Sequence, residues 1–198
     1  ELRQAIGEAR VNNLEGKVAA ITGAASGFGR ELARLAARQH MRLALADVRR
    51  DALDVVVNEL KRTGAVVISD VVDVAQAAQV QRFAEHAFSA FGHVHLLINN
   101  AGVGGGGYVW ENTARDWQWV MGVNLMGVVH GVQHFVPRML EANKRGEPGH
   151  IVNTASMAGW LAAPLMGVYN VSKHAVVALS ETLHPDLQLA QSTIGVSV

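Results

Sequence analysis

The sequence predicts an α/β protein in which helices cover both faces of one doubly wound parallel sheet. Three observations predict it: short apolar runs alternate with segments of helical period, a glycine-rich stretch follows the first run, and an aspartate ends the second. With 198 residues, 49% of them hydrophobic, the chain has apolar material for one core. We therefore expect a polar N-terminal extension over residues 1–15 and a single domain over 16–198.

The predicted elements follow one another in regular alternation. Short apolar runs predict strands at 17–22, 41–47, 65–70, 94–99, 149–156 and 193–198. Segments of helical period predict helices at 28–39, 50–62, 75–91, 113–143 and 168–190. Thr113 with Asp116, and Asp73 with Gln76, have the spacing of a capping box at a helix start. Pro185 lies inside the last predicted helix and predicts a kink or an early helix end there.

Composition excludes several classes of function. Lys+Arg and Asp+Glu both number 17, so no strong field attracts nucleic acid or an anionic membrane. The absence of cysteine excludes disulfides, thiolate zinc sites and cysteine nucleophiles. The polar opening lacks the apolar core of a secretory signal, and no apolar run is long enough to cross a bilayer. We expect a cytoplasmic protein whose partner is a small molecule recognised locally.

The stretch ITGAASGFGRELARLAAR turns from the first strand into the first helix. It leaves backbone N–H groups and the positive helix end facing open space, an arrangement that suits a pyrophosphate. The spacing Gly-x-x-x-Gly-x-Gly differs from the usual G-x-G-x-x-G, and a plain strand-to-helix turn is the alternative interpretation. The candidate cofactor-binding residues here are Gly23, Ser26, Gly27, Phe28 and Gly29.

Acidic residues end the second strand and follow the third. Asp47 is placed to accept hydrogen bonds from an adenosine ribose and to repel a 2′-phosphate, which favours NAD over NADP. Arg49 or Arg50 would weaken that preference by folding back toward the ribose. Asp73 is a candidate for the same site, with a helix N-cap as its alternative role. Its neighbour Val74 is expected to border the adenine.

Further motifs follow in order: NNAG at 99–102, then Asn124, Ser156 and Tyr169-x-x-x-Lys173. Together with the glycine turn, they resemble the short-chain dehydrogenase/reductase (SDR) family from about Lys17 onward. The resemblance implies a Rossmann fold, NAD(P)-dependent oxidoreductase activity and a homodimer or homotetramer. Asn100, Ala101 and Gly102 would pass beside the cofactor, while Asn99 supports the sheet. The family's substrate lid and last strand are expected to be missing from these 198 residues, which leaves the sixth strand at the sheet edge.

Tyr169 and Lys173 lie four residues apart, so a helix places them on nearly the same face. A free phenol titrates at about pH 10 and is a poor base at neutral pH, but a neighbouring ammonium favours the phenolate. Tyr169 can then exchange a proton with an alcohol or ketone, and Ser156 can hydrogen-bond the reacting oxygen. The resemblance adds that Lys173 holds the nicotinamide ribose. A Lys side chain extended beside a half-buried Tyr is the structural alternative.

Asn124 falls on an apolar helix face, where an unpaired carboxamide would be costly. The resemblance implies that it interrupts the helix and holds a water linked to Lys173. A core Asn with ordinary hydrogen bonds is the alternative interpretation.

The loops after the fourth and fifth strands are expected to line the substrate site. Their apolar residues predict a mainly apolar secondary alcohol or ketone, or else contacts with a partner subunit or a mobile lid; they are Met157, Trp160, Leu161, Leu165 and Met166.

His130 and His134, four apart on a helix, have metal-ligand spacing, but no third ligand is evident. We expect a subunit interface there and no metal. His95 stands near a position where the family commonly has an acidic residue, which puts a supporting contact in doubt.

Two other classes of function are considered. A methyltransferase would share the glycine turn and the acidic strand end, but it has no use for Tyr169, Lys173 and Ser156 together. A catalytically silent nucleotide sensor or scaffold on the same fold would keep the glycines and tend to lose the tyrosine or serine. The presence of all these residues favours the enzyme, with the silent sensor as the alternative.

Overall fold

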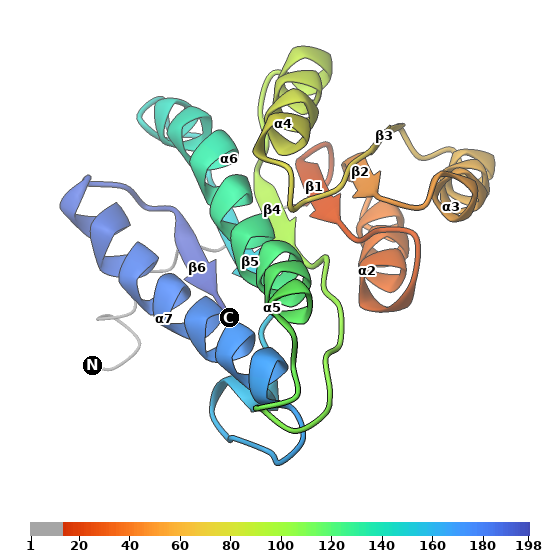
Figure 1. Ribbon diagram of the computed structural model, residues 1–198. Helices are drawn as coiled ribbons and strands as arrows, with labels where there is room; N and C mark the ends of the chain where they lie inside the picture. Colours follow the sequence, from red (N-terminus) through yellow and green to blue (C-terminus); the bar gives the residue numbers. More distant parts are fainter. Residues whose placement is uncertain (1–13) are drawn as a thin grey trace.

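The computed structural model describes residues 14–198, in which six parallel strands form one sheet (Figure 1). The strands are β1 (Val18–Thr22), β2 (Arg42–Asp47), β3 (Val67–Val71), β4 (Leu96–Asn99), β5 (His150–Asn153) and β6 (Gly195–Ser197). All six predicted strands are confirmed, each starting one or two residues later than expected. Their order is β3-β2-β1-β4-β5-β6, so β6 lies at an edge and the order reverses between β1 and β4. Parallel α/β sheets bind ligands at such a reversal, beyond the carboxyl ends of the strands.

The helices form two layers, one on each face of the sheet (Figure 1). They are α2 (Gly27–Arg38), α3 (Arg50–Arg62), α4 (Ala77–Phe91), α5 (Ala114–Met121), α6 (Gly127–Asn143) and α7 (Gly167–Leu189), with a π-helical segment at Gly122–Met126 and a 3₁₀ turn at Met157–Gly159. Residues of α4, α6 and α7 pack on one face around Phe83 and Phe135, and residues of α2 and α3 pack on the other. Alternate residues of β1 enter the two cores, since successive side chains of a strand point to opposite faces. One doubly wound domain is thus confirmed for the described part of the chain.

The π-helical segment interrupts the helix expected over 113–143 at Asn124, as the family resemblance implied, and the expected capping box at Thr113 and Asp116 is present. Two other helix expectations differ from the structure. Asp73 does not cap α4, because that helix begins at Ala77 and the Asp73 carboxylate instead accepts from the N–H of Ala75 within the preceding turn. Pro185 neither ends nor shortens α7, which continues to Leu189.

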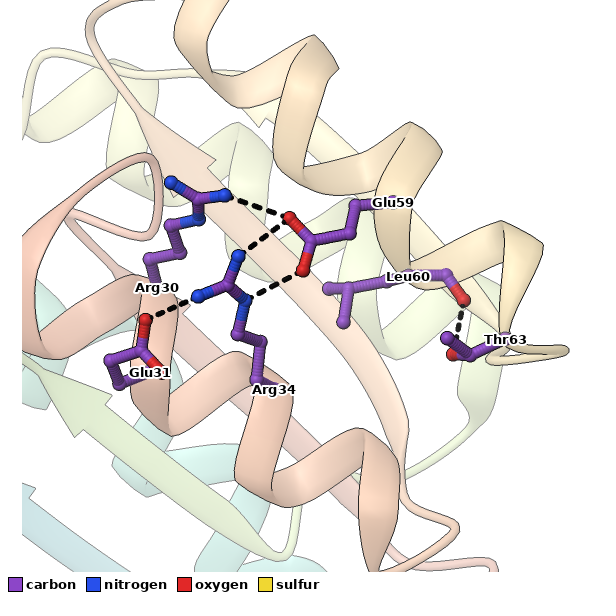
Figure 2. A network of polar contacts seen from close by, with 6 residues as sticks. All are labelled: Arg30, Glu31, Arg34, Glu59, Leu60 and Thr63. Carbon is purple, nitrogen blue, oxygen red and sulfur yellow. Dashed lines mark hydrogen bonds and ion pairs between the residues drawn. The ribbon is translucent and has the colours of Figure 1, made fainter.

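A polar network joins α2 to α3 (Figure 2). Nε and Nη2 of Arg34 donate to the two carboxylate oxygens of Glu59 at 2.6 and 2.8 Å, and Arg30 donates to the same carboxylate at 2.8 Å. These hydrogen bonds, first from Arg34 and then from Arg30, lower the pKa of Glu59 to about 2. Residues of this network line part of a cavity of about 670 Å³ between the C-terminal halves of α2 and α3. None of the predicted site residues lines this cavity, so it is separate from the predicted cofactor and substrate sites.

The buried imidazole of His95, the residue preceding β4, joins the first residue of β1 to Glu147 in the segment before β5. His95 is 3% exposed, and its Nδ1 accepts a hydrogen bond from the N–H of Val18 at 3.0 Å. Its Nε2 lies 3.2 Å from Glu147, whose carboxylate also accepts from Lys17 at 3.1 Å. Because a backbone N–H can only donate, Nδ1 is unprotonated and Nε2 carries the proton. His95 therefore makes both of these hydrogen bonds as a neutral histidine.

This histidine is expected to make stability depend on pH. Burial lowers the pKa of His95 below 6.5, with the hydrogen bond to Glu147 opposing the shift. The folded chain therefore binds the proton less readily than the unfolded chain. The contribution of His95 to stability is present above the unfolded pKa and is lost as the pH falls below about 6.5, with a slope of at most about 1.4 kcal/mol per pH unit.

Urea denaturation between neutral and mildly acidic pH measures this slope. His95→Asn keeps an acceptor for Val18 and does not titrate, so its stability should fall less steeply with acid. His184→Asn, which removes an exposed imidazole of α7, is the control and should keep the slope that is attributed to His95. Equal slopes in the wild type and His95→Asn would contradict the assignment.

Candidate active site

The glycine turn lies at the reversal of strand order, between the end of β1 and the start of α2. Gly27 has a left-handed backbone (φ +51°), and a Cβ built on it would meet no atom within 4 Å. Gly29 is the opposite case, because a Cβ there would overlap the carbonyl oxygen of Gly23 and lie 2.6 Å from Nδ2 of Asn100. The turn is therefore packed tightly on its inner side and open at Gly27. Ser26 and Phe28 are exposed beside it. A phosphate group fits this open side, where the positive end of α2 faces outward.

Asp47 holds the turn against the end of β2. It is 7% exposed, and its carboxylate accepts from the N–H of Ala25 and from the N–H of Arg49, both at 2.9 Å. The Arg49 side chain folds back: its Nη2 donates to Oγ of Ser26 at 2.6 Å, and its Nε lies 3.6 Å from the Asp47 carboxylate. Arg50 instead begins α3. Of the two arginines, Arg49 is therefore the one that folds back, and its guanidinium lies beside the Asp47 carboxylate.

The segment after β4 crosses beside the turn. Asn100 donates through Nδ2 to the carbonyl oxygen of Thr22 at 3.0 Å, and the Thr22 hydroxyl accepts from the N–H groups of Asn100 and Ala101 at 3.0 and 3.1 Å. Asn99, as expected of a supporting residue, is 2% exposed and donates to Asn153 at 2.9 Å. The side chain of Asn100 thus joins β1 to β4, and only its backbone and those of Ala101 and Gly102 are left to border a cofactor.

Asp73 and Val74, the two candidate cofactor-binding residues after β3, differ in their surroundings. Val74 is 5% exposed and packs so closely under α6 that a Cβ on Gly127 would lie 2.7 Å from it. Asp73 binds its own turn through Ala75.

The Asn124 side chain lies within the π-helical segment and is 1% exposed. Its Oδ1 accepts from the N–H of Val103 at 2.8 Å, and its Nδ2 donates to the carbonyl oxygen of Val103 and to Oγ of Ser172, both at 3.0 Å. Val103 and Ser172 are therefore the hydrogen-bond partners that the Asn124 carboxamide was expected to have on an apolar helix face. Neither was identified from the sequence, because neither is near Asn124 along the chain.

Lys173 connects the first turns of α7 to the end of β5. It is 4% exposed, its Nζ donates to the carbonyl oxygen of Thr154 at 2.7 Å, and the same Nζ lies 5.7 Å from the centre of the Tyr169 ring. Burial lowers the pKa of this amine. The 3₁₀ turn after Ser156 also packs on α7, since a Cβ on Gly159 would lie 2.9 Å from the carbonyl oxygen of Lys173. Ser156 is thus flanked on both sides by residues that contact Lys173, and its Oγ accepts from the N–H of Ala158 at 3.2 Å.

The two loops expected to line the substrate site lie side by side. The N–H of Gly107 donates to the carbonyl oxygen of Leu165 at 2.9 Å, and Gly107 and Met166 form a parallel bridge. Large apolar side chains are more than half exposed here; they are Val109, Trp110, Met157, Trp160, Leu161 and Leu165.

His130 is directed into the fold. It is 7% exposed, and its Nδ1 donates to the carbonyl oxygen of Val74 at 2.9 Å, so it joins α6 to the loop after β3. Within residues 14–198, no group of three or more His, Cys, Asp or Glu side chains is placed to hold a metal ion. In the same range, no helix is both long and apolar enough to cross a membrane.

Comparison with known proteins decides the family. The family model described as short chain dehydrogenase matches residues 17–198. The chain belongs to the short-chain dehydrogenase/reductase family. A CLA biosynthesis dehydrogenase/reductase of Lactiplantibacillus plantarum is 37% identical over 188 residues, which are 95% of this chain and 65% of that protein. The chain thus spans slightly less than two thirds of this relative's length.

Solved structures of SDR proteins share the fold. An SDR from Burkholderia phymatum in complex with NAD is 56% identical, with a TM-score of 0.91 over 93% of this chain and 65% of that one. An alcohol dehydrogenase from Thermococcus sibiricus, complexed with 5-hydroxy-NADP, is 31% identical, with a TM-score of 0.81 over 87% of this chain and 72% of that one. The Rossmann fold of an SDR protein is thereby confirmed, while these two relatives carry cofactors of both kinds.

The residues of this SDR chain fit a nicotinamide dinucleotide. The open side of Gly27 faces outward at the start of α2, and the Asp47 carboxylate lies at the end of β2. Tyr169 and Lys173 lie across the reversal point, at the start of α7. The adenosine ribose, the pyrophosphate and the nicotinamide ribose would be held in that order along the carboxyl edge by Asp47 at the end of β2, the glycine turn after β1 and Lys173 beside the end of β5.

Proposed function

We propose that this chain carries the catalytic centre of an NAD(P)-dependent oxidoreductase that interconverts a secondary alcohol and a ketone. The observation that carries the proposal is the position of Lys173, whose Nζ is held by the end of β5 and lies 5.7 Å from the Tyr169 ring centre. An amine fixed beside a phenol at the carboxyl edge of the sheet is suited to proton transfer.

Tyr169 acts as general base in oxidation and general acid in reduction. In oxidation, the phenolate oxygen takes the hydroxyl proton of the alcohol while the C–H bond breaks, giving a ketone. The bound nicotinamide supplies the acceptor for the hydride. Ser156 donates a hydrogen bond to the reacting oxygen. The positive charge of Lys173 stabilises the phenolate of Tyr169. In reduction, Tyr169 returns the proton to the oxygen of the forming alcohol.

NAD is the proposed cofactor, in preference to NADP. The preference is supported by the buried Asp47 carboxylate, which has lone pairs left to accept from both ribose hydroxyls. Arg49 opposes it, because its guanidinium would attract a 2′-phosphate. We expect the carboxylate to dominate, since it is buried and its position is fixed by two N–H groups, whereas Arg49 is largely exposed.

Asp47→Ala is expected to weaken NADH binding by about tenfold or more, the effect of losing hydrogen bonds to a charged group. NADPH binding should weaken less or improve, since repulsion of the 2′-phosphate is removed. Titration calorimetry with both cofactors measures the ratio of the NADH and NADPH dissociation constants. Asp51→Ala, which removes an exposed carboxylate in the first turn of α3, is the control. An unchanged ratio in Asp47→Ala would contradict the assigned role of this carboxylate.

The substrate is proposed to be mainly apolar, because the large apolar side chains exposed on the loops after β4 and β5 are mostly tryptophan, leucine and methionine. A screen of secondary alcohols that follows NADH formation tests both the reaction and the substrate class. We expect turnover with apolar alcohols and little with acidic or phosphorylated ones. A preference for acidic or phosphorylated alcohols would reject the substrate class but keep the reaction. Tight NADH binding without any turnover would instead favour the catalytically silent sensor.

Self-association and a cytoplasmic location complete the proposal. Trp119 on α5 is 54% exposed and Met126 in the π-helical segment is 39% exposed, which supports a homodimer or homotetramer formed through this helix. Sedimentation equilibrium of the wild type and of Trp119→Lys tests the assembly.

A further inference from the structure

One hydroxyl group on α7 bonds to two predicted site residues at once. Ser172 is fully buried (0% exposed), and its Oγ donates to the carbonyl oxygen of Tyr169 at 2.7 Å while accepting from Nδ2 of Asn124 at 3.0 Å. The directions are unambiguous, because an amide nitrogen only donates and a carbonyl oxygen only accepts. Both hydrogen bonds of Ser172 are therefore fixed in position and direction.

The second half of the connection runs from Asn124 to the loop after β4. Asn124 exchanges two hydrogen bonds with the backbone of Val103, at 2.8 and 3.0 Å. A Cβ on the preceding Gly102 would lie 3.5 Å from Oδ1 of Asn124 and 3.8 Å from Nζ of Lys173. One carboxamide and one hydroxyl thus join three segments that meet only in the folded chain: the loop after β4, the π-helical segment and the first turns of α7.

We propose that Ser172 is a positioning residue, which fixes the first turns of α7 against the π-helical segment and thereby sets the placement of Tyr169 and Lys173. The inference rests on the proposed function, since it concerns the positioning of Tyr169 as acid and base. Its physical basis is the sensitivity of proton transfer to geometry, because a misplacement of about 1 Å can reduce the rate by about a hundredfold. Asn124 alone does not fix α7, since both of its other hydrogen bonds go to Val103.

The same helix offers a matched control in Ser180. This residue is 3% exposed, and its Oγ donates to the carbonyl oxygen of Val176 at 2.7 Å and accepts from Nδ2 of Asn153 at 3.0 Å. It therefore makes the same two kinds of bond, again to a backbone carbonyl of α7 and an asparagine. It differs in lying about three helical turns beyond Tyr169. A purely structural role predicts equal consequences for Ser172→Ala and Ser180→Ala.

The experiment compares these two variants of the full chain. Ser172→Ala is expected to lower kcat by about tenfold to a hundredfold with little change in KM for the cofactor. The acidic limb of its kcat profile for oxidation should move to higher pH, because a displaced amine favours the phenolate less. Ser180→Ala should lose stability but keep kcat and the pH profile.

A second readout does not depend on activity. The chain has two tyrosines, so in a Tyr108→Phe background Tyr169 is the only one, and its ionisation can be followed by tyrosinate absorbance. In this background, Ser172→Ala should move the titration of Tyr169 to higher pH, and Ser180→Ala should leave it unchanged.

The possible results separate this inference from the proposed function. If the wild type binds NADH without turnover, the proposed reaction fails and the titration alone decides the role of Ser172. Equal kcat and equal titrations in both serine variants would overturn the inference. If Ser172→Ala does not fold, Ser172→Cys replaces it, because sulfur keeps a side chain of similar shape and weakens both hydrogen bonds; the same comparison then decides.

Discussion

Replacing Tyr169 by phenylalanine is expected to lower kcat by on the order of a thousandfold, within the range that a positioned general acid or base contributes. The change removes one oxygen atom and leaves the aromatic ring beside Lys173 in place. The melting temperature and NADH affinity should therefore remain close to those of the wild type. Steady-state kinetics with an alcohol found in the screen, together with calorimetry of NADH binding, measure both effects.

The pH dependence distinguishes loss of a proton acceptor from general damage. Wild-type oxidation should become faster with rising pH as the phenolate forms, whereas the residual rate of Tyr169→Phe should lack this limb. Turnover near the wild-type level in the phenylalanine variant would remove Tyr169 from the mechanism. A large loss of NADH affinity would assign it to cofactor binding instead.

The second large effect is expected at Gly29, where stability and cofactor binding should fall together. An alanine Cβ would overlap the carbonyl oxygen of Gly23, which is backbone and can move only by displacing the turn. Gly29→Ala should lower the free energy of unfolding by about 3 kcal/mol, as expected for overpacking at a buried site. NADH binding should also be lost, because the displaced turn no longer presents its N–H groups to a pyrophosphate.

Urea denaturation and calorimetry measure these two effects. The matched control is Gly104→Ala, because a Cβ at Gly104 meets no atom within 4 Å and its φ lies outside the left-handed region. Its free energy of unfolding should change by no more than about 0.5 kcal/mol. If Gly29→Ala were as stable as Gly104→Ala, the close contact with Gly23 would not be real.

Several hydrogen bonds of the candidate site could be identified only from the tertiary structure, because they join residues that are distant in sequence. Asn124 was expected to have partners, but Val103 and Ser172 lie 21 and 48 residues away from it. His95 could be identified only as a departure from the family, and its tautomer follows from the Val18 N–H that the sheet places against it. Asp73 had the local spacing of a helix cap, yet its carboxylate accepts a hydrogen bond from the N–H of Ala75, in the turn before α4.

By itself, the sequence determined the sheet, the family and the order of the motifs. These features depend on local properties: apolar runs of strand length, a turn that tolerates only glycine at its packed positions, and a helix that returns Tyr169 and Lys173 to one face. The tertiary structure decided which groups bind one another: Arg49 with Ser26, Lys173 with Thr154, and Ser172 with Asn124. Local periodicity cannot specify such pairs, because buried polar groups must find partners among whatever backbone and side-chain atoms the packed elements bring near.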